Sequence, residues 1–280
     1  MHSLIKAISG VVAGTLLSFS ASAVTVGYFT NTNPSADAGA AAAIATAGHT
    51  ASLLGDLTAG DLAGIDVLWI LNDDNGAPPA DFVSNAAGIA SWVALGGVLS
   101  YHDRYVNNDP NDANLMSTLL PGAGGVSFVR DFTDDANIDI LDNSTLVTNG
   151  PGGLIDGDDL DGGTSSSHGY MVLSTLPGGA TAVFSRTDPT QVVDAYWAHG
   201  AGWVYYSTIP LDYYLDGSGS EPPEAAMLRY AANEVAFQAS LAGGQAVPEP
   251  ASLALLGLGL IGLAAGRRRA PGSSGAAARR

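Results

Sequence analysis

The sequence contains no cysteine, and its single lysine, Lys6, lies near the amino end. A chain without cysteine forms no disulfide, offers no thiolate to a metal ion and has no cysteine nucleophile. If the first residues are removed during export, no lysine is left to form a Schiff base. These absences exclude a large part of enzyme chemistry for the mature protein.

Positive charge is also scarce. Ten lysine and arginine residues stand against 27 aspartate and glutamate residues, and the formal net charge is −17. Between residues 24 and 246 the lysine and arginine residues are Arg104, Arg130, Arg186 and Arg229. Because a surface this acidic repels the phosphates of nucleic acid and of anionic lipid, we expect no nucleic-acid partner. The same charge favours cations and cationic or neutral glycans.

The apolar runs are short. Near the carboxyl end, residues 252–265 would cover roughly 22 Å as a helix, less than the ~30 Å of a bilayer core. Pro248, Glu249 and Pro250 precede this run, and an arginine cluster at residues 267–269 follows it. Arginine side chains snorkel to the interface and stay on the cytoplasmic side. The pattern therefore places the upstream chain on the far side of the membrane.

The order of these features resembles the PEP-CTERM sorting signal of Gram-negative bacteria. The matching residues are Pro248, Glu249, Pro250, Arg267, Arg268 and Arg269. The resemblance implies that a tail of residues 247–270 is held transiently in the inner membrane and then cleaved by an exosortase. A permanent anchor is the alternative, and hydropathy does not separate the two. Residues 271–280 continue past the usual end of such tails and are expected to be a disordered extension.

The amino end has the features of a signal peptide. Lys6 is followed by an apolar stretch at residues 7–19 and by Ala21-Ser22-Ala23, the small-x-small pattern of a signal peptidase site. We expect signal peptidase to cleave before Val24, which makes residues 1–23 the signal peptide. An uncleaved signal anchor is the alternative. Export is consistent with a carboxyl-terminal sorting tail, since the tail requires translocation of the rest.

Residues 24–246 would then form one domain. Strand-like runs at residues 24–29, 49–54, 65–71 and 98–101 alternate with helical stretches at 36–47 and 79–95. This alternation predicts an α/β fold, a flavodoxin-like doubly wound and mainly parallel sheet. A last strand is expected at 202–208, followed by a helix at 222–238. Met227, Ala231 and Val235 recur at helical spacing and should face the sheet.

One part of this region carries a family resemblance. Residues 91–97, which read SWVALGG, and the strand that ends at His102 resemble the class I glutamine amidotransferase-like superfamily, in particular its ThuA-like branch. That family places a cysteine nucleophile at the turn after this strand, but residues 100–104 here read SYHDR. No G-x-S-x-G elbow replaces it. Amidotransferase chemistry is therefore excluded, and the sequence leans against an enzyme.

Open α/β sheets bind ligands at the carboxyl ends of their strands. Loops at residues 30–35, 72–75 and 102–105 should meet there. Their candidate ligand-binding residues are Asp73, Asp74, His102, Asp103 and Arg104. His102 and Asp103 are also the candidate acid and base, and His168 is a further candidate if its loop folds over to them. The alternative is that these are ordinary loop-forming and backbone-bonding residues.

Residues 106–191 predict a β- and loop-rich insertion, with strand-like runs at 126–130, 146–148, 170–173 and 182–186. The densest charge lies in this insertion. Its carboxylates, Asp156, Asp158, Asp159 and Asp161, are candidate Ca²⁺ ligands because Ca²⁺ takes several oxygen ligands. The spacing does not fit an EF-hand, however, and a solvated acidic loop is the alternative.

Two functions fit these observations. The first is an exported cell-surface or extracellular-matrix protein that is structural or binds extracellular polysaccharide without catalysis; Tyr213 and Tyr214, if exposed, would stack on sugar rings. The second is a secreted hydrolase that acts on an envelope or matrix glycan through His102 and Asp103, with or without a metal ion. Convergence of Asp73, His102, Asp103 and His168 would favour the second function.

Overall fold

The computed structural model describes residues 23–109, 111–163, 166–219 and 223–243. The sorting motif and the cleavage-site residue Ala21 lie outside these residues, and Ala23 is the first residue described. Within the described ranges, no helix is both long enough and apolar enough to cross a membrane.

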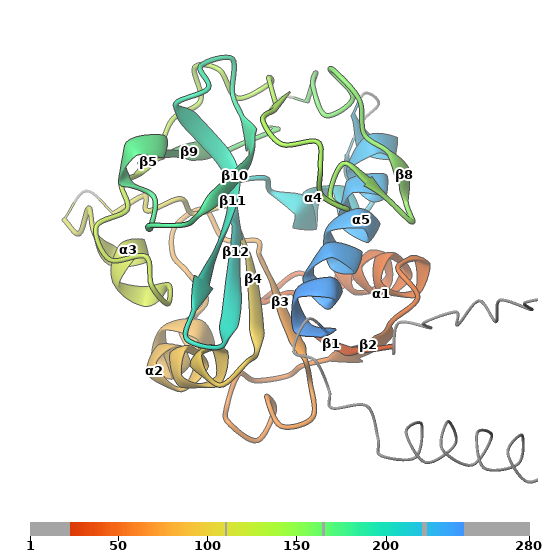
Figure 1. The fold of residues 1–280 in the computed structure, drawn as a ribbon, viewed down its shortest axis with the longest axis vertical. Helices are drawn as coiled ribbons and strands as arrows, with labels where there is room; N and C mark the ends of the chain where they lie inside the picture. Colours follow the sequence, from red (N-terminus) through yellow and green to blue (C-terminus); the bar gives the residue numbers. More distant parts are fainter. Residues whose placement is uncertain (1–22, 110, 164–165, 220–222, 244–280) are drawn as a thin grey trace, which may run out of the picture.

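The fold is mixed α/β with a mainly parallel central sheet (Figure 1). Its parallel part consists of β2 (Thr50–Leu53), β1 (Thr25–Phe29), β3 (Val67–Asn72), β4 (Val98–Asp103) and β12 (Gly202–Ser207), in that spatial order. Every residue of β3 and of β4 is buried. Their nearly continuous apolar sequences reflect this, because both faces of a central parallel strand are covered.

Antiparallel strands extend the sheet beyond β12. They are β11 (Gln191–His199), β10 (Thr181–Ser185) and β6 (Asp139–Ile140), while β9 (Gly169–Val172) pairs with both β11 and β5 (Phe128–Arg130). A separate hairpin joins β7 (Asn149–Gly150) to β8 (Gly153–Leu154). Strands therefore form near three of the runs that the sequence predicted. Residues 146–148 form no strand, and β11 was not expected.

Helices cover both faces of the sheet (Figure 1). On one face lie α1 (Asp37–Thr46), α4 (Leu211–Leu215) and α5 (Glu224–Gly243); on the other lie α2 (Ala80–Ala94) and α3 (Leu115–Leu119). Short 3₁₀ helices occupy Pro34–Ala36 and Leu173–Thr175. Each face has its own hydrophobic cluster, and all members of the two clusters fall within residues 24–242. This region therefore contains its own cores.

The helices form where apolar residues recur at helical spacing. In α2 the buried side chains are Phe82, Ile89 and Val93, and Gly96 follows the helix with a φ of 122°, which favours glycine. Met227, Ala231 and Val235 of α5 are fully buried, which confirms that this stripe faces the sheet.

The turn after β4 is tight. Val106 and Asn107 adopt φ values of 43° and 54°, and the left-handed region is unfavourable for a β-branched residue such as valine. The side chain of Asn107 holds the turn by accepting from the backbone N–H of Met116 at 3.1 Å and donating to Asp112 O at 3.1 Å. This turn fixes the positions of the residues at the end of β4.

Candidate functional site

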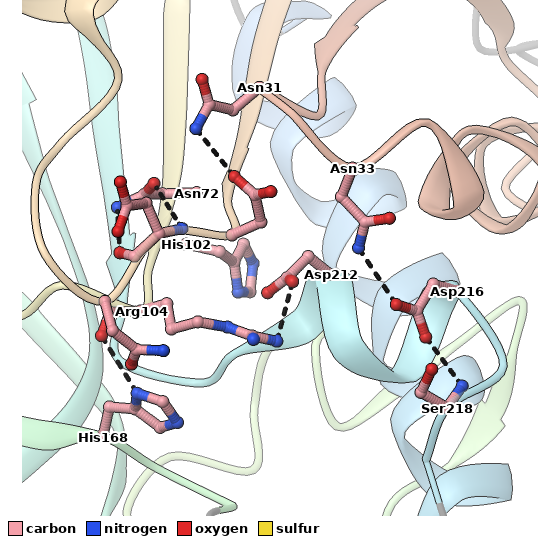
Figure 2. Close-up of polar contacts among 12 residues, drawn as sticks. Asn31, Asn33, Asn72, His102, Arg104, His168, Asp212, Asp216 and Ser218 are labelled. Atoms are coloured by element: carbon pink, nitrogen blue, oxygen red, sulfur yellow. Dashed lines mark hydrogen bonds and ion pairs between the residues drawn. The ribbon is translucent and has the colours of Figure 1, made fainter.

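Polar side chains gather at the carboxyl ends of β1, β3, β4 and β12 (Figure 2). We call the group formed by Asn31, Asn33, Asp73, Arg104, Asp212 and Asp216 the strand-end cluster. The two asparagines follow β1, Asp73 follows β3, Arg104 follows β4, and the other two aspartates belong to α4 and its end. A β-carbon at Gly39 would lie 2.2 Å from Leu215 O, so glycine in α1 lets α4 approach closely.

An ion pair lies at the centre of this cluster. Nη2 of Arg104 lies 2.7 Å from Oδ2 of Asp212, and the Asp212 residue is only 1% exposed. The two charged groups are in direct contact, and within the described residues Nε of Arg104 is buried without a hydrogen-bond partner. Burial raises the pKa of Asp212 to about 6, partly offset by Arg104. The guanidinium also lies 5.8 Å from the ring centroid of half-buried Tyr213.

The neighbouring carboxylates are held by local hydrogen bonds. Asp73 accepts from Asn31 Nδ2 at 2.7 Å and from Thr32 Oγ1 at 2.6 Å, and Asp216 accepts from Asn33 Nδ2 at 3.1 Å. Asn31 also lines a cavity of about 440 Å³, but the other residues of the cluster do not line it. Asp74 is exposed and accepts from the N–H of Gly76 at 2.6 Å, so it acts as a turn former.

His102 lies beneath this cluster and is 1% exposed. Its Nδ1 lies 3.1 Å from Ile209 O, and its Nε2 lies 2.6 Å from Oε2 of Glu234 in α5. Because a carbonyl oxygen only accepts, Nδ1 carries a proton, and Nε2 of the charged ring donates to the carboxylate. Burial alone would lower the pKa of His102, but the Glu234 carboxylate raises it above its ordinary value.

Further buried polar groups surround this pair. Ser100 Oγ donates to Glu234 Oε1 at 2.7 Å, and Gln238 Nε2 donates to the same oxygen. Asp194 accepts from the hydroxyls of Tyr205 and Tyr230 at 2.7 and 2.6 Å. Burial raises the pKa of Asp194 to about 6. We call these residues the buried cluster: Ser100, His102, Asp194, Tyr205, Tyr230, Glu234 and Gln238.

Asp103 is fully buried as well. It accepts from Tyr206 OH at 2.8 Å, from Asn72 Nδ2 at 3.2 Å and from the N–H of Tyr105 at 2.9 Å. Burial raises the pKa of Asp103 to about 6, although these hydrogen bonds lower it in part. Its carboxylate therefore ties the tight turn after β4 to the sheet.

His168 does fold over the end of β4, where it contacts Arg104. Its Nδ1 donates to Arg104 O at 3.0 Å, which leaves Nε2 as the acceptor of the ring. Burial lowers the pKa of His168 to about 4, so the ring is neutral at pH 7. Arg130 donates to the same carbonyl at 2.7 Å and to Tyr105 O at 2.6 Å. The insertion is thus attached to the end of β4 by two side chains.

The four carboxylates proposed for Ca²⁺ are engaged in other ways. Asp159 pairs with Arg229 at 3.0 Å, and Asp161 accepts from the N–H of Ile138 at 2.6 Å. Asp156 and Asp158 are exposed. Among the residues that the structure describes, no group of three or more histidine, aspartate or glutamate side chains is placed to hold a metal ion. This arrangement lends the Ca²⁺ prediction no support.

Several residues of both clusters were not expected from the sequence. Glu234 falls on the sheet-facing stripe of α5, three residues after Ala231, and a carboxylate in such a stripe is the signal that could have found it. Asp212 had no comparable signal, because a short helix after a proline is a common place for aspartate. The structure joins Arg104 to Asp212 and His168 to Arg104, whereas the sequence suggested His102 or Asp103 as the partner of His168.

The two clusters differ in what they can do chemically. The acid and base candidates, His102 and Asp103, have their polar atoms occupied below the surface. In the strand-end cluster Asn31, Asn33, Asp73, Arg104 and Asp216 are half-buried, whereas Asp212 is buried against Arg104. The half-exposed members of this cluster, and not Asp212, are therefore the groups that a ligand could contact at the surface.

At the carboxyl end of the chain, residues 246–269 match a known sorting-motif family. This segment is a PEP-CTERM protein-sorting motif. The PEP-CTERM motif implies exosortase as the processing partner, and it supports export through a membrane intermediate to the cell surface. No curated protein sequence matches the chain.

Among solved structures, the exo-beta-1,4-mannosidase Op5Man5 from Opitutaceae bacterium strain TAV5 is 16% identical at a TM-score of 0.45, covering 77% of this chain and 36% of that one. A thua-like protein from Bacteroides uniformis ATCC 8492 is 12% identical at a TM-score of 0.41, covering 66% and 81%. A beta-galactosidase from Rahnella sp. R3 is 13% identical at a TM-score of 0.41, covering 77% and 32%. The chain thus spans about a third of either glycosidase, and these likenesses carry no statement about activity.

Proposed function

We propose that this chain is an exported, exosortase-sorted protein of the cell surface or extracellular matrix, and that its α/β body binds carbohydrate without catalysis. The PEP-CTERM motif supports the sorting part of this proposal. In the proposed organisation residues 1–23 are the signal peptide, residues 24–246 the body with its insertion at 106–191, and residues 247–270 the sorting tail.

The observation that carries the binding role is the contrast between the two clusters. A catalytic acid or base must reach the substrate, but His102 is 1% exposed and Asp103 is fully buried. Both ring nitrogens of His102 and both carboxylate oxygens of Asp103 already have partners. The partly exposed strand-end cluster instead has the few convergent polar groups that fix the orientation of a bound sugar.

The course of α5 is consistent with this role. The helix starts after α4, near the strand-end cluster, and ends at the opposite end of the sheet, near the start of β1 (Figure 1). Leu241 and Val24 pack against the same hydrophobic core. A tail that continues from α5 would therefore leave the body on the side away from the strand-end cluster, which would stay accessible while the tail is held in the membrane.

We also propose that the parallel part of the sheet is flavodoxin-like. The spatial order β2-β1-β3-β4-β12 corresponds to the 2-1-3-4-5 order of such sheets. Ligands in this class bind where the strand order reverses, between the first and third strands. Asn31 after β1 and Asp73 after β3 flank that position in this chain, which favours the strand-end cluster as the binding site.

The test uses the body, residues 24–246, and polysaccharide from the producing organism. Co-sedimentation and the size distribution of the polymer are measured together, with and without Ca²⁺. Binding with an unchanged polymer is the expected result. A shortened polymer would overturn the non-catalytic role, and His102→Ala would then show whether His102 carries the cleavage. A body that sediments with no polysaccharide would contradict the proposal.

A further inference from the structure

The positive charge of this acidic protein gathers at one place. Residues 24–246 contain four arginines. Burial is the main cause of the lowered pKa of His168, and the charges of Arg104, Arg130 and Arg186 lower it further. Three of the four arginines therefore lie around one histidine at the end of β4, beside the strand-end cluster, although the chain as a whole is strongly negative.

Arg130 differs from the other arginines of the body in its charge environment. The others each form an ion pair: Arg104 with Asp212, Arg186 with Asp131 and Arg229 with Asp159. Among the residues that the structure describes, no carboxylate forms an ion pair with Arg130. Burial lowers the pKa of Arg130, and the charge of Asp103 offsets this only in part. A bound anion would supply the missing counter-charge.

The guanidinium of Arg130 is held in place and still has donors to offer. Its Nη1 donates to Arg104 O and to Tyr105 O at 2.7 and 2.6 Å, and its Nη2 donates to Asn75 Oδ1 at 2.9 Å. A guanidinium carries five N–H donors, so two remain beyond these three bonds to described residues. Because the three bonds orient the group before a ligand arrives, binding costs little side-chain entropy.

An open cavity and an exposed aromatic ring lie at this guanidinium. Arg130 lines a cavity of about 420 Å³ between β5 and the loop that follows β4, a volume within the range of small-molecule sites. The ring centroid of Phe132 lies 4.9 Å from the guanidinium, and Phe132 is 46% exposed. An exposed aromatic ring offers an apolar face to a sugar ring. A fixed cation, a cavity and a stacking surface are therefore neighbours.

We propose that Arg130 and Phe132 form a subsite for an anionic sugar, and that the glycan recognised by this protein therefore carries carboxylate or sulfate groups. The proposal rests on the carbohydrate-binding function above and adds the chemical class of the sugar. Both groups present paired oxygens to the planar donors of an arginine. The overall charge of the chain favours cationic or neutral glycans, and the oriented, unpaired Arg130 reverses this preference locally.

One carboxylate at the same cavity opposes an anion. Asp109 lines the cavity, and its Oδ1 accepts from the N–H and from the amide of Asn111 at 2.7 and 3.1 Å. Its like charge disfavours an anionic ligand there. Removing the charge of Arg130 and removing the charge of Asp109 should therefore change affinity in opposite directions, which a purely structural role of Arg130 would not produce.

The test uses residues 24–246 and polysaccharide from the producing organism in three forms: untreated, carboxyl-reduced and desulfated. Carboxyl reduction converts carboxylates into alcohols, and desulfation leaves hydroxyls, so each treatment removes one kind of anion. Co-sedimentation at about 0.15 M salt, which screens long-range repulsion, measures affinity. One treatment is expected to weaken binding at least about tenfold and thereby identifies the anion, because hydrogen bonds to charged groups are the stronger ones. Equal binding of all three forms would overturn the inference while leaving carbohydrate binding intact.

The protein variants assign the effect to this subsite. Arg130→Gln should weaken binding of the untreated polysaccharide about ten- to hundredfold, and Asp109→Asn should strengthen it severalfold. Arg229→Gln removes the same positive charge from the surface ion pair with Asp159 and is the matched control, with no change expected. An equal loss in the two arginine variants would indicate unspecific attraction and overturn the inference, and so would a loss in Asp109→Asn.

A second position keeps the test decisive if Arg130→Gln fails to fold. Phe132→Ala removes a side chain that is 46% exposed, so it should leave the free energy of unfolding nearly unchanged and still reduce binding severalfold. Leu154→Ala, at a position that is 58% exposed on β8, is its control and should bind as the wild type does. Unchanged binding in Phe132→Ala would overturn the inference. If the untreated polysaccharide does not co-sediment at all, the proposed function fails together with the inference.

Discussion

The buried cluster and the strand-end cluster lie next to each other in the fold and differ in almost every physical property. His102 and Arg104 are two residues apart, yet the first has both ring nitrogens paired below the surface and the second has a buried donor without a partner. The buried cluster contains the residue types that catalysis uses. The strand-end cluster contains half-buried polar groups at the carboxyl ends of the parallel strands.

This difference shows that residue type alone does not tell which polar side chains are fully hydrogen-bonded inside the fold. A histidine next to a glutamate invites a catalytic interpretation, but a pair this enclosed stabilises one arrangement of α5 against β4. An aspartate in a short helix suggests no role, although Asp212 is buried in an ion pair with Arg104. Four predictions separate the clusters, from the largest expected effect to the smallest.

The largest effect is expected when the buried pair is broken. Glu234→Ala leaves His102 and the hydroxyl of Ser100 without their partner and should lower the free energy of unfolding by about 3–5 kcal/mol. Glu234→Gln, which keeps a hydrogen-bonding oxygen, is the matched control and should cost clearly less. Urea unfolding measures both. A loss below about 1 kcal/mol in the alanine variant would show that the pair has little structural importance.

The second effect is a dependence of stability on pH. Asp103 and Asp194 have folded-state pKa values of about 6, above the ordinary 3.8, so the folded state binds more protons between these values. The free energy of unfolding should therefore fall as pH rises from about 4 to above 6, by on the order of 2–3 kcal/mol per carboxyl. His168 acts in the opposite direction between about 4 and 6.5, because its pKa is lowered.

Asp194→Asn tests the sign of this dependence. The variant has no carboxyl at this position, so its stability should vary less between pH 4.5 and pH 7.5 than that of the wild type in urea unfolding. Exposed Asp158→Asn serves as the control and should keep the dependence of the wild type. A steeper fall in the Asp194 variant than in the wild type would contradict the assignment.

A smaller effect, of opposite sign, is expected in the strand-end cluster. Asp212→Asn should raise the free energy of unfolding at pH 8 by about 1 kcal/mol, because burial disfavours the charged carboxylate that the amide replaces. Thermal unfolding without ligand measures the gain, and a loss above 2 kcal/mol would place Asp212 among the structural residues.

The smallest effect is expected at the surface. Arg229 and Asp159 form an ion pair at 3.0 Å with side chains that are 35% and 37% exposed. Arg229→Gln should change the free energy of unfolding by no more than about 1 kcal/mol, since exposed pairs contribute little. Denaturant unfolding at low and high salt measures it. If Arg229→Gln lowered the free energy of unfolding nearly as much as Glu234→Ala, exposure would not explain why the two ion pairs contribute differently.

Several elements could be predicted because their signals are local. The apolar run of β3, the period of α2 and α5 and the glycine after α2 are each readable within a dozen residues. β11 was missed although it is the nine-residue strand Gln191–His199, because its sequence includes the buried carboxylate of Asp194. From sequence alone a charged residue is expected at the surface, because its buried partners, here Tyr205 and Tyr230, are not known.

The sequence by itself determined the sorting motif at residues 246–269, the alternation of strands and helices and the absence of a cysteine nucleophile. These features depend on residue type and short spacing. Only the tertiary structure decided that His102 meets Glu234, 132 residues away, and that Arg104 meets Asp212. Such pairings are set by how the helices pack on the sheet, and this packing decides which polar atoms find a hydrogen-bond partner.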